Sequence, residues 1–379
     1  MKIVFCLNHL CHNGGISVAT VTKANALSEI NGYEVYIIIT DKIANEFNSN
    51  LSSRIKLIDL NINYYEYDWK SKWHLIKTYI IKGYKHKKLL QRQLREIDPD
   101  IVISVGQSEK YILPSIKGEW KLIREIHFAS DYRRLQAKNF KERIFAYINE
   151  FYDYKWKIKG YDKIVLLTQE DKERNWKNNE KVFVIPNILT FLPLSANDNQ
   201  VSKKIVSIGR LVSQKNYESL IKAFRYVCAM HPDWSLDIYG EGSQRYFLQN
   251  IIEKNSLSHN VKLAGDTKNP QEVLMASDIF VLSSYFEGFG LVLIEAMASG
   301  LPVVAYDCPC GPKDIISDGK DGFLIEPGNE TQMAEKICYL IENPDIRKQM
   351  GEAAHKRAQD YSIDNILPKW LELFDSLRQ

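Results

Sequence analysis

Short apolar runs alternate with stretches of helical periodicity along most of this 379-residue chain. At 279–282 the run Ile-Phe-Val-Leu contains no polar residue, and apolar residues then recur at helical spacing from 291 to 299. Uninterrupted apolar runs indicate strands buried on both faces, and strands that alternate with helices indicate a parallel sheet. The alternation stops in a polar, Pro- and Asn-bearing segment at 190–202 and then resumes. We therefore predict two doubly wound α/β domains joined by a linker.

The predicted domain boundaries follow this interruption. Residues 1–188 form the first domain, with strands expected at 2–8, 34–40, 55–60, 101–105, 121–126, 163–168 and 182–187. Residues 200–361 form the second domain, with strands expected at 205–208, 236–239, 261–263, 279–282, 303–305 and 322–325. Residues 362–379 carry apolar side chains at helical spacing, and we expect this last helix to pack back on the first domain.

A glycine loop with two carboxylates follows the strand at 279–282. Gly288 and Gly290 leave the backbone bare just before the helix, and the N–H groups at a helix N-terminus bind anions, most often phosphate. Glu287 lies in the loop and Glu295 lies one turn into the helix. A carboxylate does not bind phosphate. We therefore expect Glu287 and Glu295 to accept hydrogen bonds from hydroxyl groups on either side of the phosphate. Two hydroxyl-bearing groups that flank a diphosphate describe a nucleotide sugar.

Other strand ends of the second domain carry residues that suit the same ligand. Gly209, Arg210 and Lys215 follow the strand at 205–208, at the carboxyl edge where open α/β sheets bind ligands. An arginine fork and a lysine ammonium both suit phosphate oxygens, and a surface ion pair is the alternative reading of these two cations. Two further glycine loops follow later strands, at 240–242 and 265–268.

The first domain has a glycine loop of its own. Gly14 and Gly15 follow the first strand and precede a helix expected at 17–29, so the backbone there either approaches a phosphate or makes a simple tight turn. The spacing is not GxGxxG and predicts no dinucleotide site. His9 and His12 border the loop and are weaker candidates to reach a second substrate.

Together these motifs resemble the retaining glycosyltransferases of family four, which have the GT-B fold of two Rossmann-like domains facing across a cleft. The matching residues of the second domain are Gly209-Arg210 with Lys215, Gly240-Glu241-Gly242, and above all Glu287-Gly288-Phe289-Gly290 with Glu295. In the first domain the matching residues are Gly14-Gly15 and His127, and Pro186-Asn187 matches the hinge. The resemblance covers the second domain closely and the first more loosely.

The resemblance implies a role for each residue at the site. Glu295 would accept from ribose hydroxyls, Glu287 would bind the donor sugar, and His127 would lie beside that sugar. Arg210 and Lys215 would neutralise the diphosphate, and with Glu287 and His127 they form the implied catalytic set. The remaining implied donor-binding residues are Gly14, Gly15, Gly209, Gly240, Thr267, Lys268, Gly288, Phe289, Gly290 and Leu291, of which Thr267 and Lys268 lie where the base is usually held.

The resemblance also implies a retaining, metal-independent hexosyltransferase that uses a UDP-sugar as donor and no cofactor. The segment at 307–312, Asp-Cys-Pro-Cys-Gly-Pro, is similar to a variant of UDP-sugar transferases in bacterial capsule and O-antigen pathways. The implied reaction moves a hexose or N-acetylhexosamine to a lipid-linked or growing polysaccharide acceptor, in capsule, lipopolysaccharide O-antigen or exopolysaccharide synthesis. A non-catalytic nucleotide-sugar-binding subunit and a GT-B sugar-nucleotide epimerase are the alternatives. Asp98 and Asp100 resemble a metal-binding DxD but precede a strand, so we expect a turn and no metal there.

Charge is distributed unevenly along the chain. Residues 1–190 carry 31 Lys and Arg against 22 Asp and Glu, whereas the remainder carries 19 against 25. Residues 70–95 contain nine basic residues and no acidic one, interleaved with aromatic and aliphatic side chains. This stretch is either a surface that docks on anionic lipid or a solvated helix face, and no nucleic-acid-binding module accompanies it. No apolar run is long enough to span a bilayer, and we expect a cytoplasmic protein, peripheral on the inner face of the plasma membrane.

Overall fold

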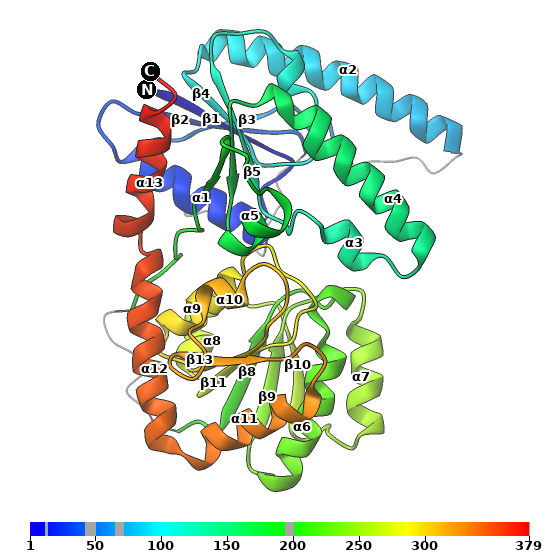
Figure 1. The fold of residues 1–379 in the computed structure, drawn as a ribbon, viewed down its shortest axis with the longest axis vertical. Coiled ribbons are helices and arrows are strands. Elements are labelled where there is room, and N and C mark those ends of the chain that lie inside the picture. Colours follow the sequence, from blue (N-terminus) through cyan, green and yellow to red (C-terminus); the bar gives the residue numbers. More distant parts are fainter. Residues whose placement is uncertain (12–13, 42–50, 65–71, 194–200, 379) are drawn as a thin grey trace.

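The computed structural model describes residues 1–11, 14–41, 51–64, 72–193 and 201–378. These residues form two sheets, one of seven and one of six strands, with helices between most successive strands. Figure 1 shows the two domains one above the other, the N-terminal domain in blue to green and the C-terminal domain in yellow-green to orange. The predicted α/β fold with two Rossmann-like parallel-sheet domains is confirmed.

The N-terminal sheet has the strand order β3-β2-β1-β4-β5-β6-β7, and each neighbouring pair is parallel. Its strands are β1 Lys2–Leu7, β2 Glu34–Ile39, β3 Lys56–Asp59, β4 Ile101–Ser104, β5 Lys121–Ile126, β6 Lys163–Leu166 and β7 Val182–Val184. Its helices include α1 Gly15–Ser28, α2 Lys72–Ile97, α3 Tyr132–Gln136, α4 Phe140–Phe151 and α5 Gln169–Asn175, and a π-helical turn, η2 Tyr152–Trp156, follows α4. The order reverses between β1 and β4, the switch point at which open α/β sheets bind ligands.

The C-terminal sheet repeats this design with the order β10-β9-β8-β11-β12-β13. Its strands are β8 Lys204–Ile208, β9 Ser235–Tyr239, β10 Val261–Gly265, β11 Ile279–Leu282, β12 Val303–Tyr306 and β13 Gly322–Ile325. Its helices are α6 Tyr217–Met230, α7 Arg245–Lys254, α8 Pro270–Met275, α9 Leu291–Ala298, α10 Pro312–Ile315, α11 Glu330–Glu342 and α12 Pro344–Ala358. The switch point lies between β8 and β11, the two strands that precede the predicted phosphate-binding residues.

Successive side chains of the central strands enter two different cores, because side chains alternate between the faces of a sheet. Phe5 of β1 belongs to the cluster that contains Leu27 of α1 and Trp370 near the C-terminus. Its neighbour Val4 belongs to the cluster on the opposite face, which contains Leu94 of α2. Burial on both faces explains why the strands lack polar alternation in the sequence.

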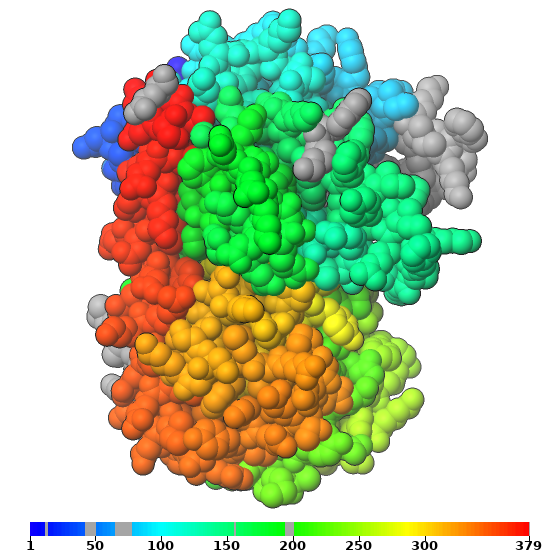
Figure 2. Space-filling view, viewed as in Figure 1, coloured from blue at the N-terminus to red at the C-terminus, as the bar shows by residue number. Residues whose placement is uncertain are grey.

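The last helix, α13 Ile363–Asp375, returns the chain to the N-terminal domain. The preceding α12 packs against α9 in the second domain, and α13 packs against α1 in the first. Trp370 and Phe374 of α13 are fully buried there. In Figures 1 and 2 the red α13 lies along the N-terminal domain, and Figure 1 shows the two ends of the chain close together. Burial of two aromatic side chains ties the end of the chain firmly to that domain.

Two helices, α2 and α4, lie at the periphery of the N-terminal domain (Figure 1). Both carry large apolar side chains in solvent. Phe140, Phe145 and Ile148 of α4 are exposed, as are Ile80 and Tyr84 of α2. Among the described residues, no helix is both long enough and apolar enough to cross a membrane.

Candidate active site

The glycine loop between β11 and α9 is held in place by backbone contacts. Gly290 has a φ of +89°, which glycine adopts without strain, and it directly precedes the first turn of α9 at Leu291. The Glu287 N–H donates to the Pro309 carbonyl at 2.9 Å. No side chain of the described residues caps this first turn. The Leu293 N–H donates to the Gly290 carbonyl at 2.8 Å, so the N–H groups of Leu291 and Val292 are the ones available to a ligand. Phe289 turns its ring inward against Tyr361, with ring centroids 5.6 Å apart, and contributes only backbone to the loop.

The structure brings Glu287 and Lys215 into direct contact. Lys215 Nζ lies 2.6 Å from Glu287 Oε1, and Ser284 Oγ donates to the same oxygen at 2.6 Å. The ends of β8 and β11 are also joined by a hydrogen bond from Ser283 Oγ to the Lys215 carbonyl at 2.8 Å. Both ionic side chains are largely shielded from solvent. The two predicted residues therefore form one preorganised ionic group at the start of α9.

The glycines after β8 and β9 allow their two loops to touch. Gly240 has a φ of +135°, and a Cβ there would lie 2.1 Å from the Gly209 carbonyl oxygen. Gly209 in turn lies against the Lys215 side chain, and a Cβ added at Gly209 would lie 3.2 Å from Lys215 Cε. Arg210 is exposed at the rim of this group. These glycines allow the two loop backbones to pack closely, and this packing positions the side chains of Arg210 and Lys215.

Glu295 is buried on α9 and contacts the connection between the domains. Thr190 Oγ1 donates to Glu295 Oε1 at 2.7 Å. Burial raises the pKa of Glu295 to about 7, and the Thr190 hydrogen bond opposes this rise. Near neutral pH this group therefore changes between a neutral acid and a carboxylate.

Thr267 and Lys268 follow β10, the outermost strand on this side of the sheet. Thr267 Oγ1 accepts a hydrogen bond from the Asn269 N–H at 3.1 Å, and Lys268 is exposed. Both lie at the same carboxyl edge as Arg210, with β9 between their strands. They are thus on the edge that the sequence predicted.

The N-terminal domain reaches the glycine loop at His127, directly after β5. A Cβ on Gly288 would lie 2.0 Å from the His127 carbonyl oxygen and 3.0 Å from Cα of Phe128. The two half-sites predicted from separate domains therefore meet at this point, and only glycine fits between them. The His127 imidazole is buried, with Nε2 3.2 Å from Glu125 Oε1.

Glu125 and Lys23 form a buried ion pair behind His127 that the sequence analysis missed. Lys23 Nζ contacts Glu125 Oε1 and lies 3.9 Å from the centre of the Trp370 ring. Burial by itself would raise the pKa of Glu125, but the charges of Lys23 and His127 outweigh it and lower that pKa to about 2. The available signals were two adjacent charged residues, Arg124 and Glu125, in the buried part of β5 and a lysine within α1.

The first glycine loop is within electrostatic range of the C-terminal domain. Gly14 directly precedes α1, and a Cβ there would lie 2.4 Å from Cys11 Sγ, whereas Gly15 faces open space. A hydrogen bond with His9 lowers the pKa of Cys11, and the charge of Arg210 lowers it further. Arg210 of the C-terminal domain is therefore close enough to act electrostatically on this loop. His12, the other predicted histidine, lies outside the described residues.

The predicted turn at Asp98 is present. Asp98 has a φ of +50°, and Asp100 Oδ2 accepts the Lys2 N–H at 2.6 Å. A separate group, Asp131, Asp171 and Cys310, places three potential ligand atoms within 4.8 Å of one another. Arg174 already donates to Asp131 at 2.6 Å and Ser130 Oγ to Asp171 at 2.7 Å, so both carboxylates have hydrogen-bond partners within the N-terminal domain.

Residues 195–357 match the family model described as glycosyl transferases group 1. An uncharacterized glycosyltransferase of Methanocaldococcus jannaschii is 30% identical over 329 residues, 74% of this chain and 80% of that protein. The chain belongs to this glycosyltransferase family. An uncharacterized glycosyltransferase of Haemophilus influenzae is 28% identical over 374 residues, which cover 97% of this chain and 98% of that one.

The fold is also found in solved glycosyltransferase structures. A mutant of S. aureus TarM, crystallised with Fondaparinux, alpha-GlcNAc-glycerol and UDP, superimposes with a TM-score of 0.79. The match covers 98% of this chain and 99% of TarM at 20% sequence identity. At that identity the likeness establishes the GT-B fold of this glycosyltransferase.

Proposed function

We propose that this glycosyltransferase moves a hexose or N-acetylhexosamine from a UDP-sugar to a lipid-linked or growing polysaccharide acceptor, with retention of anomeric configuration. The observation that carries this proposal is the Lys215–Glu287 pair, 2.6 Å apart, at the open start of α9 and beside the contact between Gly288 and the His127 carbonyl. The UDP bound in the TarM crystal structure supports the choice of nucleotide. Capsule, O-antigen or exopolysaccharide synthesis is the proposed setting.

The donor would lie along the carboxyl edge of the C-terminal sheet. Arg210, Lys215 and the N–H groups at the start of α9 would bind the diphosphate, because cations and a helix N-terminus both attract anions. Glu295 would exchange its bond from Thr190 for bonds from the ribose hydroxyls, and Glu287 would bind the transferred sugar. Gly209, Gly240, Thr267 and Lys268 would line the nucleotide, with the base near the last two.

In the proposed reaction, the bond between the anomeric carbon and the UDP oxygen breaks first, and the sugar becomes oxocarbenium-like. The developing charge on UDP is stabilised by Arg210, Lys215 and the α9 dipole, which act in place of a metal ion. The acceptor hydroxyl then forms the new bond on the face that UDP leaves, and its proton passes to a phosphate oxygen. His127 would border the sugar from the N-terminal domain, and Gly14 and Gly15 would approach the phosphate. No cofactor takes part.

We also propose that the N-terminal domain works at an anionic membrane surface, where a lipid-linked acceptor is found. The exposed Phe140 and Phe145 of α4 accompany Lys141 and Arg143 on the same helix, and α2 combines exposed Ile80 with its basic residues. Apolar side chains among cations suit insertion at a negatively charged lipid interface. Part of the basic stretch that the sequence analysis singled out, residues 70–71, lies outside the described residues.

A panel of nucleotides and nucleotide sugars tests the proposal directly. Thermal unfolding of the protein should shift upward with UDP and with one or a few UDP-sugars, because a ligand that binds only the folded state stabilises it by mass action. Slow release of UDP from the stabilising donor, accelerated by an added acceptor, would separate a transferase from a non-catalytic subunit. An unchanged melting curve with every uridine nucleotide would contradict the proposal.

A further inference from the structure

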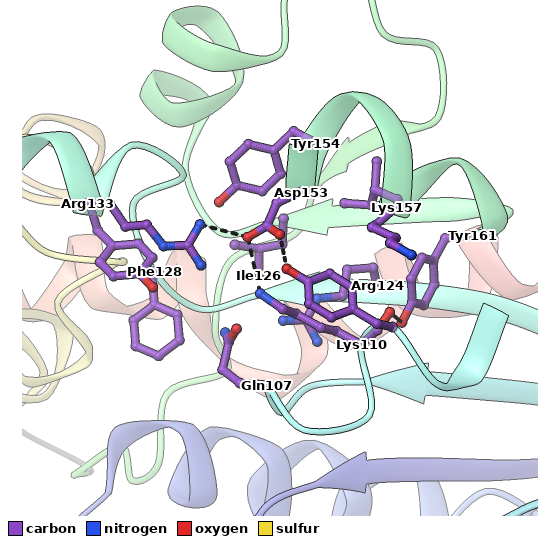
Figure 3. A pocket seen from close by; sticks show the side chains of 13 residues that line it. Gln107, Lys110, Arg124, Ile126, Phe128, Arg133, Asp153, Tyr154, Lys157 and Tyr161 are labelled. Carbon is purple, nitrogen blue, oxygen red and sulfur yellow. Dashed lines mark hydrogen bonds and ion pairs between the residues drawn. The ribbon is translucent and has the colours of Figure 1, made fainter. Parts of the chain in front are cut away.

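A pocket lies at the carboxyl ends of β4 and β5 in the N-terminal domain, close to His127, which directly follows β5. It is lined by Gln107, Lys110, Tyr111, Arg124, Ile126, Phe128, Tyr132, Arg133, Asp153, Tyr154, Lys157, Ile158 and Tyr161 (Figure 3). Phe128, which directly follows His127, is among them, so the pocket adjoins the point where Gly288 meets the N-terminal domain. A group bound here would lie beside the proposed donor sugar.

The lining of the pocket has a surplus of positive charge. Lys110, Arg124, Arg133 and Lys157 are the four cations of the lining, and Asp153 is its one carboxylate. A second carboxylate outside the lining, Glu109, lies 3.7 Å from Arg124. Four cations against two carboxylates leave two positive charges without compensation.

Three of the four cations are held in fixed positions by hydrogen bonds. Asp153 Oδ2 accepts from Arg133 at 2.7 Å and from Lys110 at 3.2 Å, and Tyr111 donates to the other oxygen. Arg124 donates to Ser104 Oγ at 2.7 Å. Figure 3 shows the Asp153 carboxylate between Arg133 and Lys110, with dashed lines to both. Because Arg133, Lys110 and Arg124 are fixed before any ligand arrives, an anion would bind to them with little reorganisation.

Lys157 is the cation best placed to serve a ligand. Its ammonium lies 5.9 Å from the centre of the Tyr111 ring and 5.4 Å from that of Tyr152, and no ion pair among the described residues includes it. It directly follows the π-helical turn η2, a distortion that occurs often at functional sites. The same turn carries Asp153 and Tyr154 into the lining. The local distortion of the chain thus builds one wall of the pocket.

We propose that this pocket binds an anionic group of the acceptor, a phosphate or a carboxylate, while the neighbouring aromatic rings contact its sugar or polyol. The inference rests on the proposed function and names the chemistry of its second substrate. A neutral glycan gains less from two uncompensated cations than an anion does, because it offers them hydrogen bonds but no charge. A negatively charged acceptor would be drawn to the pocket and positioned with its hydroxyl toward the donor.

Calorimetric titration of the 379-residue protein, saturated with UDP to block the donor site, tests the inference. The probes are glycerol 3-phosphate, glycerate and glycerol, which share a backbone and differ in charge. We expect one or both anions to bind and glycerol not to bind, and their relative affinities distinguish phosphate from carboxylate as the natural group. Lys157→Ala should weaken binding about tenfold, the scale of one charged hydrogen bond. Lys159→Ala, at an exposed lysine two residues away that is not in the lining, is the matched control and should bind as the native protein does.

Equal binding of the anions by the native protein, Lys157→Ala and the charge-reversing Lys157→Glu would overturn the inference, and so would absence of anion binding. Thermal unfolding of each variant with and without UDP shows whether it is folded and has a working donor site. If UDP binds and the anions do not, the pocket inference fails and the proposed function stands. If UDP does not bind, the proposed function fails, and the same titration of the UDP-free protein still decides the pocket.

Discussion

Thr190 Oγ1 donates to Glu295 Oε1 at 2.7 Å, so the segment that joins the two domains is bonded to the carboxylate proposed to hold the ribose. The two residues are 105 positions apart in the sequence. A ribose hydroxyl that takes the place of the Thr190 hydroxyl on Oε1 would release the interdomain segment from this carboxylate. Occupation of the nucleotide site and the position of the interdomain segment are therefore coupled through one oxygen atom.

Glu295→Gln should remove a pH dependence of stability. The pKa of Glu295 is about 7 in the folded protein, whereas an exposed glutamate has an ordinary pKa of 4.5. Between these values the folded protein binds more protons than the unfolded chain, so the free energy of unfolding falls as pH rises from 4.5 to 7. The full shift corresponds to about 3 kcal/mol. Urea unfolding at pH 5 and pH 8 should show that the glutamine variant gains stability relative to the native protein at the higher pH. An equal change in the free energy of unfolding between the two pH values in both proteins would contradict this.

Gly288→Ala should separate the two half-sites. A Cβ at this position would lie 2.0 Å from the His127 carbonyl oxygen, so the domains must move apart or the loop must shift. A displacement of about 1 Å at a catalytic centre costs roughly 10²-fold in rate. We expect that loss of transfer with UDP binding retained. Gly83→Ala, in α2 with open space around it, is the matched control and should keep full activity.

Glu125→Gln should destabilise the N-terminal domain because it leaves the Lys23 ammonium buried without a counter-charge. Removing one partner of a buried pair typically costs about 3–5 kcal/mol. Adding Lys23→Met should restore most of the stability, since methionine adapts to the space beside Trp370. Urea unfolding measures both variants. Glu34→Gln, in an exposed pair with Lys56, should change little, and an equal loss in this control would argue against burial as the cause.

The elements of this fold could be predicted from the sequence because its strands are buried on both faces. The expected strands at 121–126, 279–282 and 322–325 agree with β5, β11 and β13 at both ends. Where boundaries differ, as at β1, the strand ends at Leu7 one residue before the expected Asn8. The predicted strand ends also indicate which residues lie at the site, because parallel strands place the loops that follow them on one edge of the sheet. The meeting of Lys215 with Glu287 needs one thing more, that β8 and β11 are neighbours in the sheet.

The contacts between domains could not be predicted in the same way. The bond from Thr190 to Glu295 depends on how one domain rests on the other, and Thr190 read only as the start of a polar linker. The Lys23–Glu125 pair joins residues 102 positions apart, and its partners are set by helix packing. The cationic pocket depends on a π-helical turn, and no local pattern distinguishes that turn from the end of an ordinary helix.

Lys215→Ala and Glu287→Ala should each lower the transfer rate by at least about 10²-fold, the effect of losing one preorganised electrostatic contact. Each variant also leaves its partner without the contact that fixes it at 2.6 Å. The effects should therefore not add, and the double variant should lose little more than either single one. Steady-state rates with the donor found in the nucleotide panel give this comparison. Full activity in both single variants would exclude the pair from the site.

Phe145→Ser should weaken binding to vesicles if α4 docks on the membrane. The Phe145 side chain is 70% exposed and lies on the same helix as Lys141 and Arg143, so serine removes apolar area from the interface without changing charge. Phe247→Ser on α7 of the C-terminal domain is the matched control, because that phenylalanine is 45% exposed and lies in the other domain. Co-sedimentation with vesicles that contain anionic lipid should fall for Phe145→Ser alone, and salt should weaken binding of the native protein by screening its charges. Equal sedimentation of both variants and the native protein would leave α4 as an exposed helix with no role at a lipid surface.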